Sequence, residues 1–378
     1  MIEPYSFLSA LRKAKIKFVT GVPDSLLKDI CAYIDKKFSK KKHIIATNEG
    51  SAVGLAIGHY LATKKPALVY MQNSGLGNSI NPTVSLADPK VYGIPIIFLI
   101  GWRGENLKNG RQINDEPQHL KQGKITLQQL KILGIPYKTI DCKTKNINFI
   151  LLKLKKLALK RKGPVALVAR KGTFLKFKTS KIDKMSNFIS RENAINQIII
   201  KLNKKVATIS TTGMASRELF ELRKFNKQSN GGDFLTIGGM GHANQIATGI
   251  ALEKPQRKIL CIDGDGSVLM HMGSLAVSAQ CSNLTHIILN NESHDSVGGQ
   301  PTKGGEINFI KIAKACGYKN AKIVTKSSEI SRTVNKEINK KGSSLIVIKC
   351  RKGHRSNLDR PNQKLFKSKK KFMDFLTN

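Results

Sequence analysis

Short apolar runs alternate along the first half of the chain with longer segments in which apolar residues recur every three or four positions. The short runs have the length of buried strands, and the periodic segments are typical of amphipathic helices. The predicted strands are residues 16–20, 43–46, 67–71, 94–100, 137–140 and 165–168. The predicted helices are residues 3–15, 24–38, 49–62, 126–133 and 147–161. This alternation predicts a parallel β-sheet with helices on both faces.

The alternation stops in a lysine-rich, nonperiodic segment and then starts again. The predicted strands of the second half are residues 206–209, 258–262, 285–289 and 344–348. The predicted helices are residues 191–202, 215–222, 244–251, 270–281, 307–316, 329–338 and 367–376. The chain is therefore predicted to form two doubly wound α/β domains. We place them at residues 1–170 and 190–378, with a linker at 171–189 and a basic tail at the C-terminal end.

Two predicted strands of the second half end in side chains that carry oxygen. Asp265 lies in the motif Gly264-Asp265-Gly266-Ser267, and the pair Asn290-Asn291 follows the next strand. Either motif alone is typical of an ordinary turn. Because the carboxyl ends of neighbouring parallel strands face the same crevice, both motifs can contact one ion. Carboxylate, amide and carbonyl oxygens suit Mg²⁺, so we expect Asp265, Asn291 and the Ser293 carbonyl to bind it.

Two glycine-containing segments each stand at the start of a predicted helix. They are residues 210–214 and 238–243. Glycine lets backbone N–H groups approach a phosphate, and the helix dipole favours negative charge there. Ordinary helix starts remain an alternative interpretation of both segments. The chain contains neither GxGxxG nor GxxxxGK[ST], which counts against a dinucleotide-binding or P-loop domain.

The formal net charge of +40 raises the question of an acidic partner. The lysines are spread along the whole chain, and aromatic residues make up only 6% of it. A compositional bias explains this pattern better than a nucleic-acid surface with stacking aromatics, and attraction of an anionic substrate is a further possibility. No apolar run reaches the roughly 20 residues of a membrane span. We therefore expect neither nucleic acid nor membrane as a partner.

The cysteine pattern bears on the cellular compartment. The six cysteines are scattered and include no CxxC pair. The first residues also lack the basic and then apolar layout of a signal peptide. We therefore expect reduced thiols and a cytoplasmic location.

A further motif, Asn48-Glu49-Gly50, lies between a predicted strand and a helix of the first half. It is followed along the chain by Gly239-Met240-Gly241, Gly264-Asp265-Gly266 and Asn290-Asn291. With these motifs in this order, the chain resembles the thiamine diphosphate-dependent 2-oxo acid decarboxylases. In that family a pyrimidine-binding domain and a diphosphate-binding domain share thiamine diphosphate and Mg²⁺. The resemblance implies these roles for residues 1–170 and 190–378, without the middle domain of larger members.

The resemblance also implies roles for individual residues. Glu49 would hydrogen-bond the aminopyrimidine ring of the cofactor, Met240 would lie between its two rings, and His294 would relay a proton. Asp265, Asn291 and Ser293 would hold the metal ion. The other residues expected to bind the cofactor are Thr211, Thr212, Gly213, Gly239, Gly241, His242, Gly264, Gly266, Ser267 and Asn290.

Several further segments resemble the branch of the family whose 2-oxo acid substrates carry a phosphonate or a sulfonate. These segments are residues 21–27, 72–82, 101–104, 115–119, 211–218 and 294–301. A guanidinium fork matches a tetrahedral oxyanion, so Arg103 is the first candidate for binding it. The other candidates are Ser25, Asn73, Ser74, His119 and Arg111. Phosphonate, sulfonate and a carboligase reaction on the same cofactor all remain open.

The resemblance has two more consequences. Family members place the shared cofactor between subunits, which implies a homo-oligomer that acts on a small anionic 2-oxo acid. One residue departs from the family pattern, because Glu292 follows the asparagine pair where a small residue is more usual. Its charge would stand close to the expected metal ion.

Overall fold

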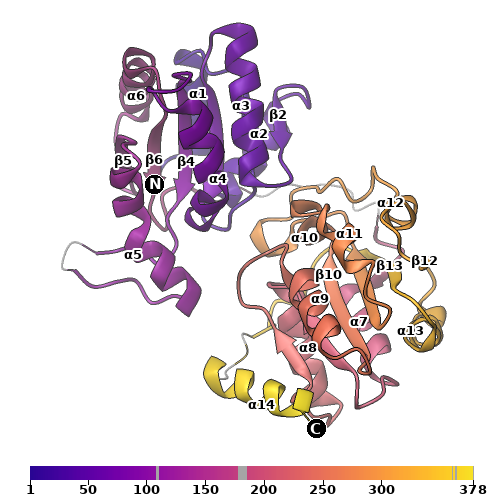
Figure 1. The fold of residues 1–378 in the computed structure, drawn as a ribbon. Helices are drawn as coiled ribbons and strands as arrows, with labels where there is room; N and C mark the ends of the chain where they lie inside the picture. Colours follow the sequence, from indigo (N-terminus) through magenta and orange to yellow (C-terminus); the bar gives the residue numbers. More distant parts are fainter. Residues whose placement is uncertain (108–109, 178–184, 360, 362–363, 378) are drawn as a thin grey trace. The chain divides into compact units, whose positions relative to one another are not determined.

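The chain forms two compact units, Met1–Lys181 and Ile182–Asn378, each built around its own parallel sheet (Figure 1). The computed structural model describes residues 1–107, 110–177, 185–359, 361 and 364–377. The middle of the predicted linker, residues 178–184, lies outside the described residues. The boundaries predicted for the two domains therefore stay predictions, and each unit is described by itself.

The first unit contains a sheet with the strand order β2-β1-β3-β4-β6-β5, and every pair is parallel. The strands are β1 (Val19–Gly21), β2 (His43–Ile45), β3 (Ala67–Gln72), β4 (Ile96–Gly101), β5 (Tyr137–Ile140) and β6 (Val165–Ala169). The helices are α1 (Pro4–Lys13), α2 (Lys28–Lys37), α3 (Glu49–Thr63), α4 (Leu76–Pro82), α5 (Pro117–Ile132) and α6 (Ile147–Arg161), with the short helices η1 (Asn73–Gly75) and η2 (Thr83–Ala87).

Strand β4 shows why helices cover both faces of this sheet. Its six residues are all buried, so neither face of the strand meets solvent. Ile97 and Leu99 belong to the core formed with α1, α2 and α6. Phe98 and Ile100 point to the opposite core, which includes residues of α3 and α5. The continuous apolar run therefore serves two cores at once, as in a doubly wound sheet.

The second unit has the strand order β12-β13-β11-β10-β8-β9, with β7 paired to β13. The strands are β7 (Ile189–Ser190), β8 (Ala207–Ser210), β9 (Asp233–Leu235), β10 (Ile259–Gly264), β11 (Leu284–Asn290), β12 (Asn320–Val324) and β13 (Ser344–Arg351). The helices are α7 (Arg191–Ile199), α8 (Met214–Phe225), α9 (Ala243–Glu253), α10 (Asp265–Met270), α11 (Ser274–Ser278), α12 (Phe309–Ala315), α13 (Ile330–Asn339) and α14 (Leu365–Thr377), with η3 (Asp295–Val297) and η4 (Ser327–Glu329).

Helices also cover both faces of the second sheet. Residues of α7, α8 and α13 share one core. Residues of α9 and α14 form a second core, and residues of α11 and α12 form a third. In the part of the chain that the structure describes, no helix is both long and apolar enough to cross a bilayer.

The strand orders locate a crevice in each unit. In the first unit the chain moves from β1 to β2 on one side and to β3 on the other. In the second unit it moves from β8 to β9 on one side and to β10 on the other. At such a switch point the connections leave the sheet in opposite directions and open a crevice at the carboxyl ends of the strands. Ligand-binding residues are therefore expected after β1 and β3, and after β8 and β10.

Some local predictions were wrong. The helix predicted at residues 24–38 begins at Lys28, because Asp24 accepts hydrogen bonds from the N–H groups of Leu26 and Leu27 and holds a turn there. In place of the helix predicted at residues 270–281, α10 ends at Met270, a turn covers residues 271–273, and α11 covers only Ser274–Ser278. The predictions also omitted α4, which is rich in small and polar residues, β9, which has only three residues, and β12, which begins with the polar and small residues Asn-Ala-Lys.

A close approach between α5 and the segment after β4 generates a stability prediction. A Cβ added at Gly123 would collide with the carbonyl oxygen of Gly104. We expect Gly123→Ala to lower the free energy of unfolding by about 1–3 kcal/mol, as overpacking does. In the control Gly58→Ala, the added Cβ has no neighbour within 4 Å. That variant should gain up to about 1 kcal/mol in urea unfolding from helix propensity. Stabilisation by both variants would refute the close approach.

Candidate active site

Three buried polar side chains stand at the adjacent ends of β10 and β11 in the second unit. Asp265 begins α10, and Asn290 and Asn291 stand at the end of β11. The Thr302 hydroxyl donates to Asp265 Oδ2, and Asn290 Nδ2 donates to the Gly304 carbonyl over 2.8 Å. The two motifs predicted to meet therefore lie beside one another, under the same loop.

The donor set around Asp265 fits a hard cation. Burial raises the pKa of Asp265 to about 6, against hydrogen bonds from Thr302 and the Gly266 N–H that lower it. A carboxylate that is costly to bury gains most from a neighbouring positive charge. Asn291 Oδ1 lies 3.1 Å from the Ser293 N–H, and the buried Ser293 hydroxyl has no hydrogen-bond partner among the described residues. Carboxylate, amide and backbone oxygens are the ligands that Mg²⁺ prefers.

The two glycine segments converge on Ser267. Its hydroxyl lies 2.9 Å from Thr211 Oγ1 and accepts a hydrogen bond of 3.0 Å from the Gly241 N–H. Gly213 and Gly241 have φ angles of +91° and +89°, which favour glycine. The segments after β8 and before α9 therefore both contact α10. Backbone groups and hydroxyls at this point suit a phosphate.

The remaining predicted cofactor residues stand in the same segments. Thr212 is half-buried beside Gly213, and Met240 is half-buried between an exposed Gly239 and a buried Gly241. His242 is exposed, and its Nδ1 lies 3.1 Å from the Gly239 carbonyl oxygen.

His294 lies over the start of α10. A Cβ added at Gly266 would come within 3.1 Å of the His294 ring, so the glycine leaves room for the imidazole. The backbone N–H of His294 donates to the backbone carbonyl of Gln300 over 2.8 Å. Burial lowers the pKa of His294 to about 4, so the ring is neutral at neutral pH. A neutral imidazole has one nitrogen that accepts a proton and one that donates.

Glu49 is a buried carboxylate in the first unit. It is the first residue of α3, and the side chain of Asn48 caps this helix by accepting from the Ser51 N–H over 2.8 Å. Asn78 Nδ2 donates to Glu49 Oε2 over 2.9 Å. The Gly75 backbone packs against the carboxylate so closely that an added Cβ would lie 2.5 Å from Oε1. This local packing leaves Glu49 6% exposed.

Arg103, which follows β4, contacts residues that follow β1 and β3 in the first unit. Its guanidinium makes two hydrogen bonds to Asp115 and a third, of 3.0 Å, to Ser25 Oγ. Asn73 Nδ2 donates to the Arg103 carbonyl over 3.0 Å. Burial alone would raise the pKa of Asp115, but the hydrogen bonds and charge of Arg103 hold it well below its usual range.

Of the other three candidates, Ser74 and His119 lie beside this group, and Arg111 is exposed. Ser74 donates to Gln72 Oε1 over 2.9 Å, and Gln72 donates to Asp24 Oδ1 over 2.7 Å. His119 Nε2 lies 3.4 Å from Glu116 Oε2. His119 Nδ1 is buried and has no hydrogen-bond partner among the described residues.

Sequence reasoning missed the roles of Thr302, Gly304 and Asp115. Thr302 and Gly304 contact Asp265 and Asn290 from a loop with no periodic pattern. Asp115 stands in a segment that supported the family resemblance, but only the folded chain shows that it pairs with Arg103.

Glu292 is paired with a lysine. Its Oε1 lies 3.1 Å from Lys349 Nζ, and both side chains are largely buried. The charge that departs from the family pattern is thus balanced within the same unit.

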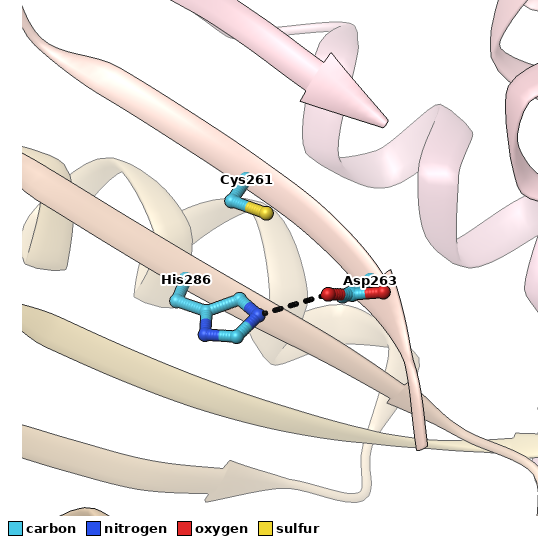
Figure 2. A group of neighbouring side chains, drawn as sticks. All are labelled: Cys261, Asp263 and His286. Carbon is cyan, nitrogen blue, oxygen red and sulfur yellow. Dashed lines mark ion pairs between the residues drawn. The ribbon is translucent and has the colours of Figure 1, made fainter. Parts of the chain in front are cut away.

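A further polar cluster lies inside the second sheet (Figure 2). Cys261 and Asp263 lie two residues apart on β10, and His286 on β11 stands opposite Cys261. Potential ligand atoms of all three lie within 4.8 Å of one another, and Asp263 Oδ2 is 3.5 Å from His286 Nε2. All three are fully buried, and the Tyr318 hydroxyl lies 3.4 Å from His286 Nδ1. We interpret the cluster as a polar contact that joins β10 to β11.

Known proteins with similar sequences define the class. The family model "Thiamine pyrophosphate enzyme, N-terminal TPP binding domain" matches residues 6–130, and "Thiamine pyrophosphate enzyme, C-terminal TPP binding domain" matches residues 211–348. Phosphonopyruvate decarboxylase of Streptomyces viridochromogenes is 30% identical, covering 100% of this chain and 96% of that protein. The chain therefore belongs to the thiamine pyrophosphate enzyme family, whose cofactor is also called thiamine diphosphate. Within this family it is a carboxy-lyase.

Two relatives match shorter parts of the chain. Sulfopyruvate decarboxylase subunit alpha of Methanococcus maripaludis is 38% identical, covering 42% of this chain and 89% of the subunit. Sulfopyruvate decarboxylase subunit beta of Methanocaldococcus jannaschii is 32% identical, covering 42% of this chain and 82% of the subunit. The family resemblance and the predicted pair of parallel-sheet domains are confirmed.

The buried charge of Asp265 generates a prediction about stability. Because its folded pKa is raised from 3.8 to about 6, the stability of the metal-free protein should fall as pH rises through that interval. Without Mg²⁺, Asp265→Asn should therefore melt at a higher temperature than wild type at pH 7.5, with a smaller gain at pH 5. Mg²⁺ with thiamine diphosphate should raise the melting temperature of wild type alone.

The control for this experiment is Asp233→Asn. This carboxylate is also buried, but it pairs with Arg223 over 2.9 Å. Its loss leaves a buried guanidinium without its partner, so this variant should melt at a lower temperature. A lower melting temperature for metal-free Asp265→Asn at pH 7.5 would contradict the uncompensated charge.

Proposed function

We propose that the chain catalyses the decarboxylation of 3-phosphonopyruvate to phosphonoacetaldehyde and CO₂, with thiamine diphosphate and Mg²⁺, in phosphonate biosynthesis. Two relatives named phosphonopyruvate decarboxylase support this substrate. Their alignments cover the whole of this chain and 96% and 94% of the relatives' own length. The named sulfopyruvate decarboxylase subunits each cover less than half of the chain.

The observation that carries the proposal is the group around Arg103. The Arg103 guanidinium is paired with Asp115 and donates to the Ser25 hydroxyl, and the Asn73 amide donates to the Arg103 backbone carbonyl, at the carboxyl ends of β1, β3 and β4. A phosphonate offers three oxygens to the guanidinium, and it would bind either beside the Asp115 carboxylate or in its place. Ser74 and His119 complete the proposed substrate residues. The net charge of +40 would favour the approach of an anionic 2-oxo acid.

The second unit supplies the proposed cofactor site. Asp265, Asn291 and the Ser293 carbonyl would hold Mg²⁺, which in turn would hold the diphosphate. The segments around Thr211 and Gly241 would offer N–H and hydroxyl donors to the phosphate oxygens, and Met240 would support the rings. Bound thiamine diphosphate supplies the electron sink that makes the loss of CO₂ possible.

Two residues are proposed to handle protons. The Glu49 carboxyl would hydrogen-bond the aminopyrimidine ring and hold a proton there, in a buried setting that excludes water. The neutral His294 would relay a proton to the product carbon after CO₂ leaves, because a neutral imidazole can accept a proton at one nitrogen while it donates from the other.

The assembly and the domain roles belong to the same proposal. We assign residues 1–170 to pyrimidine binding, 171–189 to a linker and 190–378 to diphosphate binding. The active enzyme would be a homo-oligomer with sites between subunits. The relatives named as alpha and beta subunits support an assembly of more than one chain.

A sulfonate substrate is the closest alternative. Sulfopyruvate carries the same 2-oxo acid and a tetrahedral anion, and the matching sulfopyruvate decarboxylase subunits favour keeping it as a candidate. A carboligase reaction on the same cofactor would be recognised by a coupled product instead of a free aldehyde.

The substrate assignment predicts the outcome of an aldehyde-release assay with phosphonopyruvate, sulfopyruvate and pyruvate. Phosphonopyruvate should give the highest kcat/KM in the presence of Mg²⁺ and thiamine diphosphate. Arg103→Lys keeps the charge but loses the fork, so the KM for phosphonopyruvate should rise by about tenfold or more. Turnover of pyruvate, which has no second anion, should change little. A higher kcat/KM with sulfopyruvate would show that sulfopyruvate is the substrate. An unchanged KM in Arg103→Lys would show that Arg103 does not recognise the phosphonate.

The role of Glu49 predicts a loss of turnover without a loss of fold. Glu49→Gln keeps the shape of the side chain but cannot hold the proton, so kcat should fall far below a tenth of wild type. Glu105→Gln is the matched control, since Glu105 is also buried in the first unit and pairs with Arg170 over 3.4 Å. It should lower the melting temperature and keep turnover in the folded fraction. More than about a tenth of wild-type activity in Glu49→Gln, roughly 1.4 kcal/mol in barrier, would rule out the role.

A further inference from the structure

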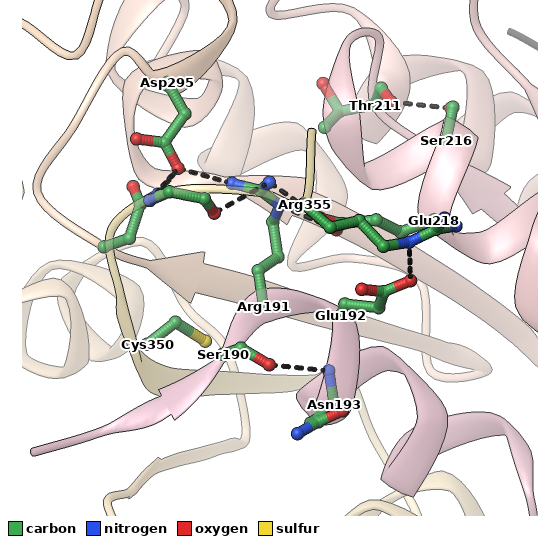
Figure 3. A network of polar contacts seen from close by, with 12 residues as sticks. Ser190, Arg191, Glu192, Asn193, Thr211, Ser216, Glu218, Asp295, Cys350 and Arg355 are labelled. Carbon is green, nitrogen blue, oxygen red and sulfur yellow. Dashed lines mark hydrogen bonds and ion pairs between the residues drawn. The ribbon is translucent and has the colours of Figure 1, made fainter. Parts of the chain in front are cut away.

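A buried arginine, Arg191, contacts Glu218 and Asp295 in a polar network of the second unit (Figure 3). Arg191 is the first residue of α7, and its side chain is 8% exposed. It donates two hydrogen bonds to Glu218 on α8, of 2.7 and 2.8 Å. A third, of 2.8 Å, runs to Asp295 Oδ2. The bidentate contact with Glu218 fixes the plane of the guanidinium, so the third bond has a defined direction.

Asp295 accepts from three donors at one oxygen. Besides Arg191, its Oδ2 accepts from Asn291 Nδ2 over 2.7 Å and from the Gly353 N–H over 3.0 Å. The donors come from the start of α7, the end of β11 and the segment after β13. Asp295 is therefore held from several sides, and its position is decided by parts of the chain that are distant in sequence.

The contact with Asn291 decides which way its amide faces. An asparagine side chain can present either oxygen or nitrogen to a neighbour, and only the oxygen can bind a cation. Because Nδ2 is engaged by the Asp295 carboxylate, Oδ1 must face the other way. There it accepts from the Ser293 N–H over 3.1 Å.

We propose that Asp295, held by Arg191, is a positioning residue that orients the Asn291 amide so that its oxygen faces the metal ion. The inference rests on the proposed function, since Asn291 is a metal ligand only there. Partners behind the ligands of metal sites fix ligand orientation in this way, and their loss commonly weakens metal affinity 10–100-fold.

The charges of the network support the same role. Two carboxylates, Glu218 and Asp295, face one guanidinium, so the buried group carries one excess negative charge. A divalent cation at Asp265 would be attracted by that charge through a medium that screens it weakly. Asp295 also directly follows His294, and its fixed position restrains the turn η3 that begins there.

The test uses full-length protein and measures the Mg²⁺ concentration at which thiamine diphosphate binding, followed by calorimetry, is half-maximal. Asp295→Ala removes the acceptor for Asn291, and the midpoint should rise about 10–100-fold. Asp295→Asn keeps an oxygen in the same place, so its midpoint should lie between wild type and Asp295→Ala. The melting temperature of each metal-free variant is measured in parallel. Midpoints equal to wild type in both variants would overturn the proposal.

A purely structural role is separated by a control and by a double variant. Asp233→Ala breaks another buried pair, Arg223–Asp233, which touches none of the proposed ligands. It should lower the melting temperature and leave the Mg²⁺ midpoint unchanged. Because Asp295 is proposed to act chiefly through Asn291, adding Asp295→Ala to Asn291→Ala should raise the midpoint far less than the product of the two single effects. Additive effects would overturn the positioning role.

The same titration distinguishes this proposal from the proposed function. Wild type should bind thiamine diphosphate tightly only when Mg²⁺ is present. Asp265→Asn should bind thiamine diphosphate weakly, and added Mg²⁺ should not strengthen that binding. If wild type binds the cofactor without any divalent cation, the metal site itself is wrong and Asp295 has no ligand to orient. If wild type and Asp265→Asn behave as expected and Asp295→Ala keeps the wild-type midpoint, only the positioning role is lost.

Discussion

The register between β10 and β11 is the constraint on which the proposed metal site depends. Gly264 pairs with Leu289, so Asp265 follows β10 at the level where Asn290 ends β11. A shift of one residue would turn Asn291 to the opposite face and separate it from Asp265. Both strands are buried on two sides, which fixes their register through packing. The apolar residues of these strands thus determine the geometry of the polar residues that follow them.

The polar groups below and behind this edge belong to the same constraint. Asp263 and His286 join β10 to β11 one layer beneath Asp265, and Arg191 with Asp295 joins α7 to the end of β11. Buried ion pairs add little net stability compared with apolar packing, but breaking one partner is costly. These contacts contribute to orientation more than to stability, because each one fixes a strand or a side chain next to a proposed ligand.

The sequence predicted most strands, and it predicted that Asp265 and the Asn290-Asn291 pair follow neighbouring strands, because apolar runs and the polar residues that end them are local signals. It did not predict that Asp115 pairs with Arg103 or that Asp295 binds Arg191, 104 residues away. Such partners are chosen by the folded chain and leave no periodic trace. Local competition caused the other errors: the Asp24 side chain holds a turn where a helix start was expected, and the loop with Thr302 has no repeating pattern.

The pairing of Arg103 with Asp115 has a consequence for how an anion would be selected. The guanidinium is not an open positive charge, since a carboxylate already occupies two of its donors. A substrate that binds there must compete with or supplement a monovalent counter-ion fixed within the protein. Common monovalent anions gain little from that exchange, whereas a group carrying two charges gains more. The Asp115 carboxylate would then favour the binding of anions with two charges over anions with one, whatever their shape.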